Sequence, residues 1–321
     1  MTGTSSFLGA ALLRRLLERH GADDVVAIDV ASPPATLHGV RRLLDFTEPS
    51  SDQRLMDALG EEEVHTLLHL AFFTSPRHDT THAHELESIG TLNLLGAAAA
   101  AGVSHVVMRS FTAVYGARGQ NPNFIREDHK LQPNPALGWA RDKVEAEQHA
   151  ASFAKRYEAL KVTVLRLAPL LGPGVRNFYT RIFDHRVVPV LMGFDPLFQL
   201  LHPEDALLAF EAALAQSPGG AFNIVPRGSL SLATALHLAL KIPLPVPHVM
   251  AYAATDLLWA AGVGQAPSGF VDYARYPVLG DGEKAERELG FRPSFSSRDA
   301  LMAYLDYRYP ARAGDAAEAL S

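Results

Sequence analysis

The chain has 321 residues, of which 48% are hydrophobic and 20% are charged, and its formal net charge is -6. The composition is that of a globular protein with a sizeable core. The absence of a basic stripe argues against nucleic acid as a partner, and the acidic balance argues against an anionic membrane surface. There are no cysteines, which excludes disulfides and thiolate chemistry. With no basic leader before an apolar stretch, a cytoplasmic protein is expected.

A glycine-containing loop opens the chain and leads into an amphipathic helix predicted over 8–20. The loop residues are Gly3, Ser6, Phe7, Leu8 and Gly9. Backbone N–H groups at the start of such a helix can receive a pyrophosphate, so the loop predicts a dinucleotide site. Gly3 and Gly9 are alternatively simple turn and packing glycines. A buried strand normally precedes this loop, yet only Met1 stands before Thr2. We favour a true start further upstream over a sheet that lacks the strand.

Apolar strand-like runs alternate with helical patterns, which predicts βαβ units and a parallel sheet. Strands are expected near residues 25–29, 42–44, 64–71, 105–108 and 162–167. Further helices are expected over 51–59, 80–101 and 136–157. After residue 174 the pattern loosens into short elements separated by prolines. We therefore expect a first domain over 1–172, to which some later segments return, a smaller mixed lobe over 173–309 and a frayed tail over 310–321.

Further landmarks follow the loop at regular intervals. They include Asp29, Asp45-Phe46, His69-Leu70-Ala71, Val114-Tyr115-Gly116, Lys143 and the segment 288–293. In this order and spacing the chain resembles an extended short-chain dehydrogenase/reductase of the NAD-dependent epimerase/dehydratase type. The resemblance implies an α/β fold with a Rossmann-type doubly wound parallel sheet, here with its first strand missing or truncated, and a smaller C-terminal substrate lobe.

The resemblance implies NAD as the cofactor. Asp29, at the end of a strand, would accept hydrogen bonds from the adenosine ribose, and its charge favours NAD over NADP; otherwise it is a solvated carboxylate. The hydroxyl of Ser6 either hinders the phosphates or adds a hydrogen bond. The cofactor-binding residues expected on this basis are Gly3, Ser6, Phe7, Leu8, Gly9, Asp29, Asp45, Phe46, Leu70, Ala71 and Lys143.

Most catalytic groups of that family are replaced here. The family uses a serine or threonine, together with a tyrosine and a lysine placed four residues apart on one helix face. Lys143 is present, but Trp139 occupies the tyrosine position, and an indole N–H only donates. Phe111 stands at the hydroxyl position and Glu87 at a position where relatives often carry asparagine. Since the loss of one positioned acid or base costs about 10²–10⁴ in rate, the family's ordinary chemistry is not expected.

Tyr115 is the predicted substitute acid, because it follows the fourth strand where relatives face substrate. Glu127, Asp128 and His129 lie in the next loop as further candidates, each with a structural alternative. Lys143 is alternatively a surface lysine. No metal is expected, since the histidines at 78, 82 and 84 have no carboxylate cluster in register with them.

The later half says little about substrate. Asn177, Arg181, Arg227 and Arg275 are candidates to hold a diphosphate by region only. The apolar segments 191–201 and 242–261 indicate either a hydrophobic substrate or a dimer or core surface. The resemblance also implies a homodimer through the helices over 80–101 and 136–157.

Two functional hypotheses follow. The first is an atypical epimerase/dehydratase or oxidoreductase acting on a nucleotide sugar or another small hydroxyl or carbonyl compound. The second is a catalytically silent NAD-binding sensor or partner-binding protein. A third reading, that the chain folds poorly without its first strand, would be removed by a cooperative thermal transition.

Overall fold

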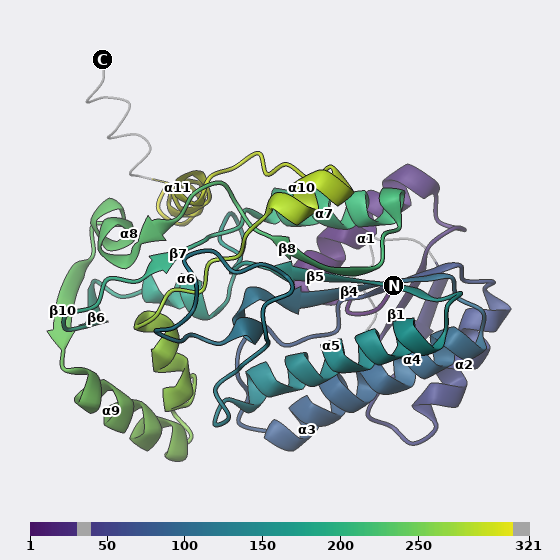
Figure 1. Ribbon diagram of the computed structural model, residues 1–321, viewed down its shortest axis with the longest axis horizontal. Helices are drawn as coiled ribbons and strands as arrows, with labels where there is room; N and C mark the ends of the chain where they lie inside the picture. Colours follow the sequence, from purple (N-terminus) through teal and green to yellow (C-terminus); the bar gives the residue numbers. More distant parts are fainter. Residues whose placement is uncertain (31–39, 311–321) are drawn as a thin grey trace.

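The computed structural model describes residues 1–30 and 40–310, so all of the predicted tail except Pro310 lies outside the described residues. A parallel sheet forms the centre of the first domain (Figure 1). Its strands in spatial order are β2 (Val40–Leu43), β1 (Val26–Asp29), then β3 (Thr66–His69), β4 (His105–Phe111), β5 (Lys161–Leu167) and β8 (Gly220–Ile224). This is the doubly wound α/β sheet that the sequence predicts.

The slot of the first strand, between β1 and β3, is occupied by Met1 and Thr2. Thr2 bridges to Ile28 on one side and to His69 on the other. The Met1 carbonyl accepts from the Ile28 N–H at 2.7 Å, and the Thr2 N–H donates to the Leu68 carbonyl at 2.8 Å. Two residues therefore connect β1 to the rest of the sheet at the position of the first strand.

Helices cover both faces of this sheet (Figure 1). On one face lie α2 (Ser51–Glu61), α4 (Gly90–Ala100) and α5 (Gly138–Arg156), and on the other lie α1 (Phe7–His20), α7 (Pro203–Gln216) and α10 (Glu283–Leu289). Side chains alternate between the two faces along each strand, so a hydrophobic core forms on each face of the sheet. Val106 and Met108 pack with the first group of helices, and Val107 packs with the second. Segments α7, β8 and α10, all beyond residue 172, thus belong to this sheet.

The remaining elements form a smaller lobe. Strand β6 (Val187–Leu191) pairs in parallel with β10 (Ile242–Val246), and β7 (Leu197–Phe198) pairs antiparallel with β9 (Leu230–Ser231). The lobe's helices are α6 (Phe178–Ile182), α8 (Leu232–Leu238), α9 (His248–Ala260), η3 (Ser268–Ala274) and α11 (Ser297–Arg308). Helix α9 has no buried residue. Among the described residues, no helix is long and apolar enough to cross a membrane.

The helix predicted over 80–101 is present over residues 80–100, but it is not a regular α-helix throughout. It runs as α3 (Thr80–His84), a π-helical turn η1 (Glu85–Ile89) and then α4. A π-turn inserts one extra residue and redirects the side chains around it, and such turns are frequent at functional sites. Here the turn contains Glu87, which is fully buried against α5.

His69 at the end of β3 makes the fold sensitive to acid. Its two ring nitrogens bond the hydroxyls of Thr2 at 2.7 Å and Thr91 at 3.1 Å. Burial, with a smaller contribution from the positive chain terminus, lowers its pKa to about 3. Because the unfolded chain then binds a proton that the folded chain refuses, stability is lost as pH falls from about 6.5 towards 3. We expect a loss of about 2 kcal/mol between pH 6.5 and 5 from this group. Denaturant unfolding of the wild type and His69→Gln measures it, and parallel pH profiles would contradict it.

Candidate functional site

The glycines of the N-terminal loop are required by close backbone contacts. Gly3 has a φ of +71°, and a Cβ on it would lie 2.5 Å from the Leu70 carbonyl carbon and 2.6 Å from the Ala71 nitrogen. A Cβ on Gly9 would lie 2.0 Å from the Gly3 carbonyl oxygen. No Cβ is tolerated at such distances. The loop therefore presses against the end of β3 and against the first turn of α1, which agrees with a cofactor loop and equally with turn and packing glycines.

The start of α1 is prepared for an anion. Ser6 is the N-cap, and its hydroxyl accepts from the Gly9 N–H at 3.1 Å and donates to the Gly3 carbonyl at 2.8 Å. The Ser6 hydroxyl thus holds the loop closed. Among the described residues, the backbone N–H groups of Phe7 and Leu8 have no hydrogen-bond partner. Free N–H groups at a helix N-terminus suit a phosphate, so this loop fits a dinucleotide.

Asp29 faces the same loop. Its Oδ2 accepts from the Ser5 N–H at 2.8 Å and from the Thr4 hydroxyl at 3.2 Å, while Oδ1 accepts from the Val30 N–H at 2.8 Å. A carboxylate accepts about four hydrogen bonds, so Asp29 supports the loop and keeps capacity for a ribose hydroxyl. This places it within the loop structure, in contrast to a solvated strand-end carboxylate.

The other predicted cofactor contacts lie near this end of the sheet. Phe46 and Leu70 are buried. Asp45 accepts from the Thr47 hydroxyl at 2.7 Å and from its N–H at 2.9 Å. Burial works to raise the pKa of Asp45, but these bonds and nearby His82 lower it overall. Asp45 is therefore ionised at neutral pH.

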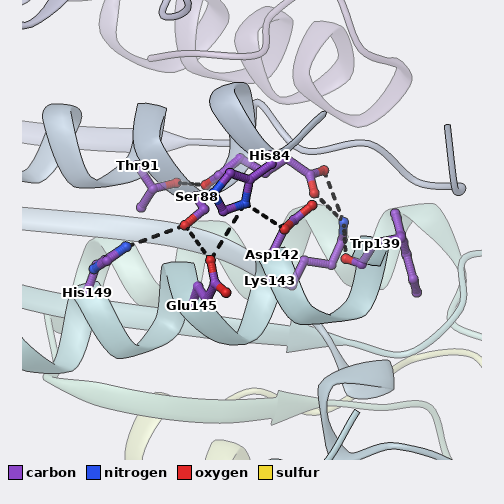
Figure 2. Close-up of polar contacts among 9 residues, drawn as sticks. His84, Ser88, Thr91, Trp139, Asp142, Lys143, Glu145 and His149 are labelled. Atoms are coloured by element: carbon purple, nitrogen blue, oxygen red, sulfur yellow. Dashed lines mark hydrogen bonds and ion pairs between the residues drawn. The ribbon is translucent and has the colours of Figure 1, made fainter. Parts of the chain in front are cut away.

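Lys143 is sequestered in a buried ion pair. Its Nζ donates to the two carboxylate oxygens of Glu87 at 3.0 and 2.8 Å and to the Trp139 carbonyl at 3.2 Å. Lys143 is 1% exposed and Glu87 is 0% exposed, so the surface-lysine alternative is wrong. Burial lowers the pKa of Lys143 and raises that of Glu87, and each partner opposes the shift of the other. Figure 2 shows Lys143 and Trp139 on the same helix, α5.

Two aromatic side chains lie over the ion pair. The ring of Trp139 lies 4.3 Å from the Lys143 Nζ, and that of Phe111 lies 5.1 Å from it. The indole N–H of Trp139 donates to the Phe73 carbonyl at 2.9 Å, which fixes the ring in place. In this arrangement Trp139 and Phe111 form an apolar wall, and the lysine lies behind it.

A cavity of about 310 Å³ opens on the other side of that wall. It extends from Ser6, Phe7 and Leu8 of the glycine loop to the second lobe. Its aromatic lining includes Phe73, Phe111, Trp139, Tyr179, Phe198 and Tyr273, and its polar lining includes Arg109, Asn177 and Gln199. Neither Lys143 nor Tyr115 lines it. A ligand next to a dinucleotide in the loop would thus meet mainly aromatic surface.

Tyr115 does not lie where a substitute acid is needed. It is fully buried, its hydroxyl donates to Asn223 Oδ1 at 2.7 Å, and it accepts from Arg166 at 2.8 Å. Burial raises its pKa to about 12, against the opposing charge of Arg166. Arg166 in turn pairs with Glu147 of α5. The geometry gives Tyr115 a structural role and does not support the acid role predicted from sequence.

The neighbouring loop candidates join the same structural network. Glu127 accepts from the Asn223 N–H at 2.8 Å, and its carbonyl accepts from Arg166 at 3.0 Å. The ring of His129 packs beside Tyr115. Like Asp128, these residues do not line the cavity. The loop therefore supports β4 and β8 from the side away from the ligand.

The second-lobe candidates are dispersed. Asn177 lines the cavity beside the loop, and Arg181 lines a second, largely apolar cavity of about 450 Å³ under α9. The two cavities share Tyr179, Phe198 and Tyr273. Arg227 donates to a backbone carbonyl and Arg275 packs on aromatic rings. The structure does not bring these four residues together as a diphosphate clamp.

His84 of α3 does have carboxylate neighbours, contrary to the sequence analysis. His84 Nδ1 lies 2.9 Å from Asp142 and 3.6 Å from Glu145 (Figure 2). One ligand atom from each of these residues falls within 4.8 Å of the others. The carboxylates come from α5, so no reading of spacing around residue 84 could find them.

Two residues of the cavity were missed by sequence reasoning. Arg109 stands in the otherwise apolar strand segment 105–111, and a charge inside a buried strand is a usable signal. Tyr179 follows the glycine-rich turn at 172–174 and carries no local signal. Its hydroxyl makes no hydrogen bond to the part of the chain that the structure describes.

The fold and the loop together define a dinucleotide-binding protein with a doubly wound sheet and an appended ligand lobe. The chain belongs to the NAD-dependent epimerase/dehydratase family, whose model matches residues 1–225. NAD is the cofactor of that family, as the sequence predicts.

Three relatives illustrate the match. An uncharacterised protein of Mycobacterium tuberculosis is 30% identical over 310 residues, covering 95% of this chain and 82% of its own. The dTDP-glucose 4,6-dehydratase of Streptomyces griseus is 27% identical over 329 residues, covering 94% and 91%. The structure of MoeE5 in complex with UDP-glucuronic acid and NAD superposes with a TM-score of 0.75 at 22% identity, over 97% and 98% of the two chains. The last likeness concerns the fold.

Proposed function

We propose that this protein binds NAD at the loop of residues 3–9 and acts as an atypical epimerase/dehydratase or oxidoreductase on a hydroxyl or carbonyl compound held in the adjoining cavity. The observation that supports this most is the continuity between the glycine loop and the 310 Å³ cavity. When bound, NAD supplies or accepts a hydride. A nucleotide sugar is the first substrate class to screen, because relatives named above act on or bind such compounds.

The residues that would hold NAD are those already placed around the loop. The N–H groups of Phe7 and Leu8 would receive the phosphates, Asp29 would accept from the adenosine ribose, and the backbone at Ala71 would contact the cofactor. The predicted contact between Lys143 and the nicotinamide ribose needs Trp139 to move aside, since the lysine is paired with Glu87. Calorimetric titration with NAD tests this assignment, and no binding would contradict it.

Tyr179 is our candidate for the polar contact to the reacting oxygen. It lines both cavities, and its hydroxyl has no partner within residues 1–30 and 40–310. Burial raises its pKa, so the hydroxyl stays protonated and donates. Once a substrate is found, we expect Tyr179→Phe to lower kcat/KM by about 10²-fold or more. Tyr273→Phe is the matched control, because that phenol lines the same cavity but donates to the Ala113 carbonyl at 2.7 Å. Equal effects of the two changes would remove the role.

A catalytically silent NAD-binding protein is the second candidate. The wall of Trp139 and Phe111 over Lys143 favours it, since no histidine, carboxylate or lysine among the described residues lines the cavity. Transfer of deuterium from labelled NADH to a screened carbonyl compound separates the two candidates, and its absence across the screen would favour the silent protein.

Two further expectations belong to this proposal. Helices α4 and α5 lie side by side on an outer face (Figure 1), and we propose that face as the homodimer contact. The absence of cysteines supports a cytoplasmic location.

A further inference from the structure

Arg109 is a buried cation that faces the cavity without a partner. It lies near the end of β4, is 2% exposed and lines the 310 Å³ cavity. Its guanidinium carbon lies 4.7 Å from the centre of the Phe111 ring, two residues further along the strand. It makes no hydrogen bond or ion pair with any residue that the structure describes, and its Nε is buried and unsatisfied. A buried guanidinium in this state is costly unless a ligand completes it.

The nearest opposite charge is already engaged. The charge of Glu87 stabilises the charged form of Arg109 without direct contact. Both carboxylate oxygens of Glu87 accept from Lys143, and one also accepts from the Phe73 N–H. Burial lowers the pKa of Arg109 to about 10, with Glu87 opposing the shift. Arg109 therefore carries its charge at neutral pH. Because both oxygens of Glu87 are held by Lys143, no carboxylate among the described residues forms an ion pair with Arg109 at the cavity wall.

We propose that Arg109 binds a carboxylate carried by the ligand that occupies this cavity. A planar guanidinium presents paired N–H groups that match the two oxygens of a carboxylate. The surrounding aromatic rings, among them Trp139 and Tyr273, suit an apolar body attached to that group. The inference deepens the proposed function, because it concerns the same cavity, but it does not depend on hydride transfer.

Thermal unfolding with small probes tests the proposal in the absence of NAD. Benzoate carries the carboxylate on an aromatic ring, benzamide is its neutral counterpart, and phenyl phosphate carries a phosphoryl group. We expect millimolar benzoate to raise the Tm of the wild type and benzamide not to do so. Equal shifts with benzoate and benzamide would overturn the proposal. A larger shift with phenyl phosphate than with benzoate would overturn the choice of a carboxylate.

Two variants assign the effect to Arg109. Arg109→Met removes the buried charge that lacks a partner, so the Tm of this variant without ligand should exceed that of the wild type by roughly 3 °C or more. Benzoate should no longer raise its Tm. Arg109→Lys keeps the charge but lacks the paired N–H groups of the guanidinium, and we expect about tenfold weaker benzoate binding. A benzoate shift unchanged in both variants would overturn the proposal, and the lysine variant alone decides if the methionine variant does not fold.

Calorimetry with NAD on the same proteins separates this inference from the proposed function. Benzoate binding through Arg109 without NAD binding would leave the anion site standing and reject the proposed function. NAD binding with no Arg109-dependent benzoate binding would reject the anion site and leave the proposed function standing.

Discussion

Lys143→Met is expected to lower the free energy of unfolding by about 3–5 kcal/mol, because it leaves the carboxylate of Glu87 buried without its cation. Glu87 is fully buried, and Lys143 supplies a hydrogen bond to each of its oxygens. What remains is one N–H from Phe73. Urea unfolding of the wild type and the variant measures the loss.

The double variant Glu87→Gln/Lys143→Met distinguishes a lost charge partner from lost packing. It removes both charges but keeps an acceptor for the Phe73 N–H, so we expect it to be more stable than Lys143→Met alone. The deficit of the single variant should also grow with pH above the ordinary range of a glutamate, since burial already raises the pKa of Glu87. Additive losses and a flat pH profile would show that the pair is only a packing contact.

Gly9→Ala is expected to weaken NAD binding by about 10- to 100-fold. The new Cβ would lie 2.0 Å from the Gly3 carbonyl oxygen, and relieving such a contact costs about 1–3 kcal/mol and separates the loop from α1. Calorimetric titration with NAD compares the wild type and the variant.

Gly96→Ala in α4 is the matched control. Nothing lies within 4 Å of a Cβ there, so alanine should leave NAD binding unchanged and stabilise the helix by up to about 1 kcal/mol. If Gly9→Ala bound NAD as tightly as Gly96→Ala, the loop would not be the cofactor site.

The features behind these two predictions are not equally easy to infer from the sequence. The loop, Asp29 and the alternation of strands and helices rest on local patterns, since a glycine of positive φ or an apolar period depends on the residues nearby. The π-turn η1 carried no such pattern. It lies within a helical segment and contains Glu87, whose carboxylate pairs with Lys143 of α5.

The role of Tyr115 shows the same limit. Its position after β4 resembles a substrate-facing residue, but Asn223 and Arg166 reach its hydroxyl from β8 and β5. Partners more than fifty residues away along the chain decided that it is buried. Likewise, Asp142 and Glu145 meet His84 only because α3 packs on α5.

The amino-acid sequence by itself determined the family, the doubly wound sheet and NAD as the cofactor, because each is written in local residue types and their spacing. Only the tertiary structure decided the surroundings of Lys143 and Arg109: Trp139 and Phe111 cover Lys143, Glu87 pairs with it, and Arg109 lines the cavity without a hydrogen-bond partner among the described residues. The physical reason is that charge compensation and burial depend on which distant elements pack together, and the spacing of residues along one chain does not specify that packing.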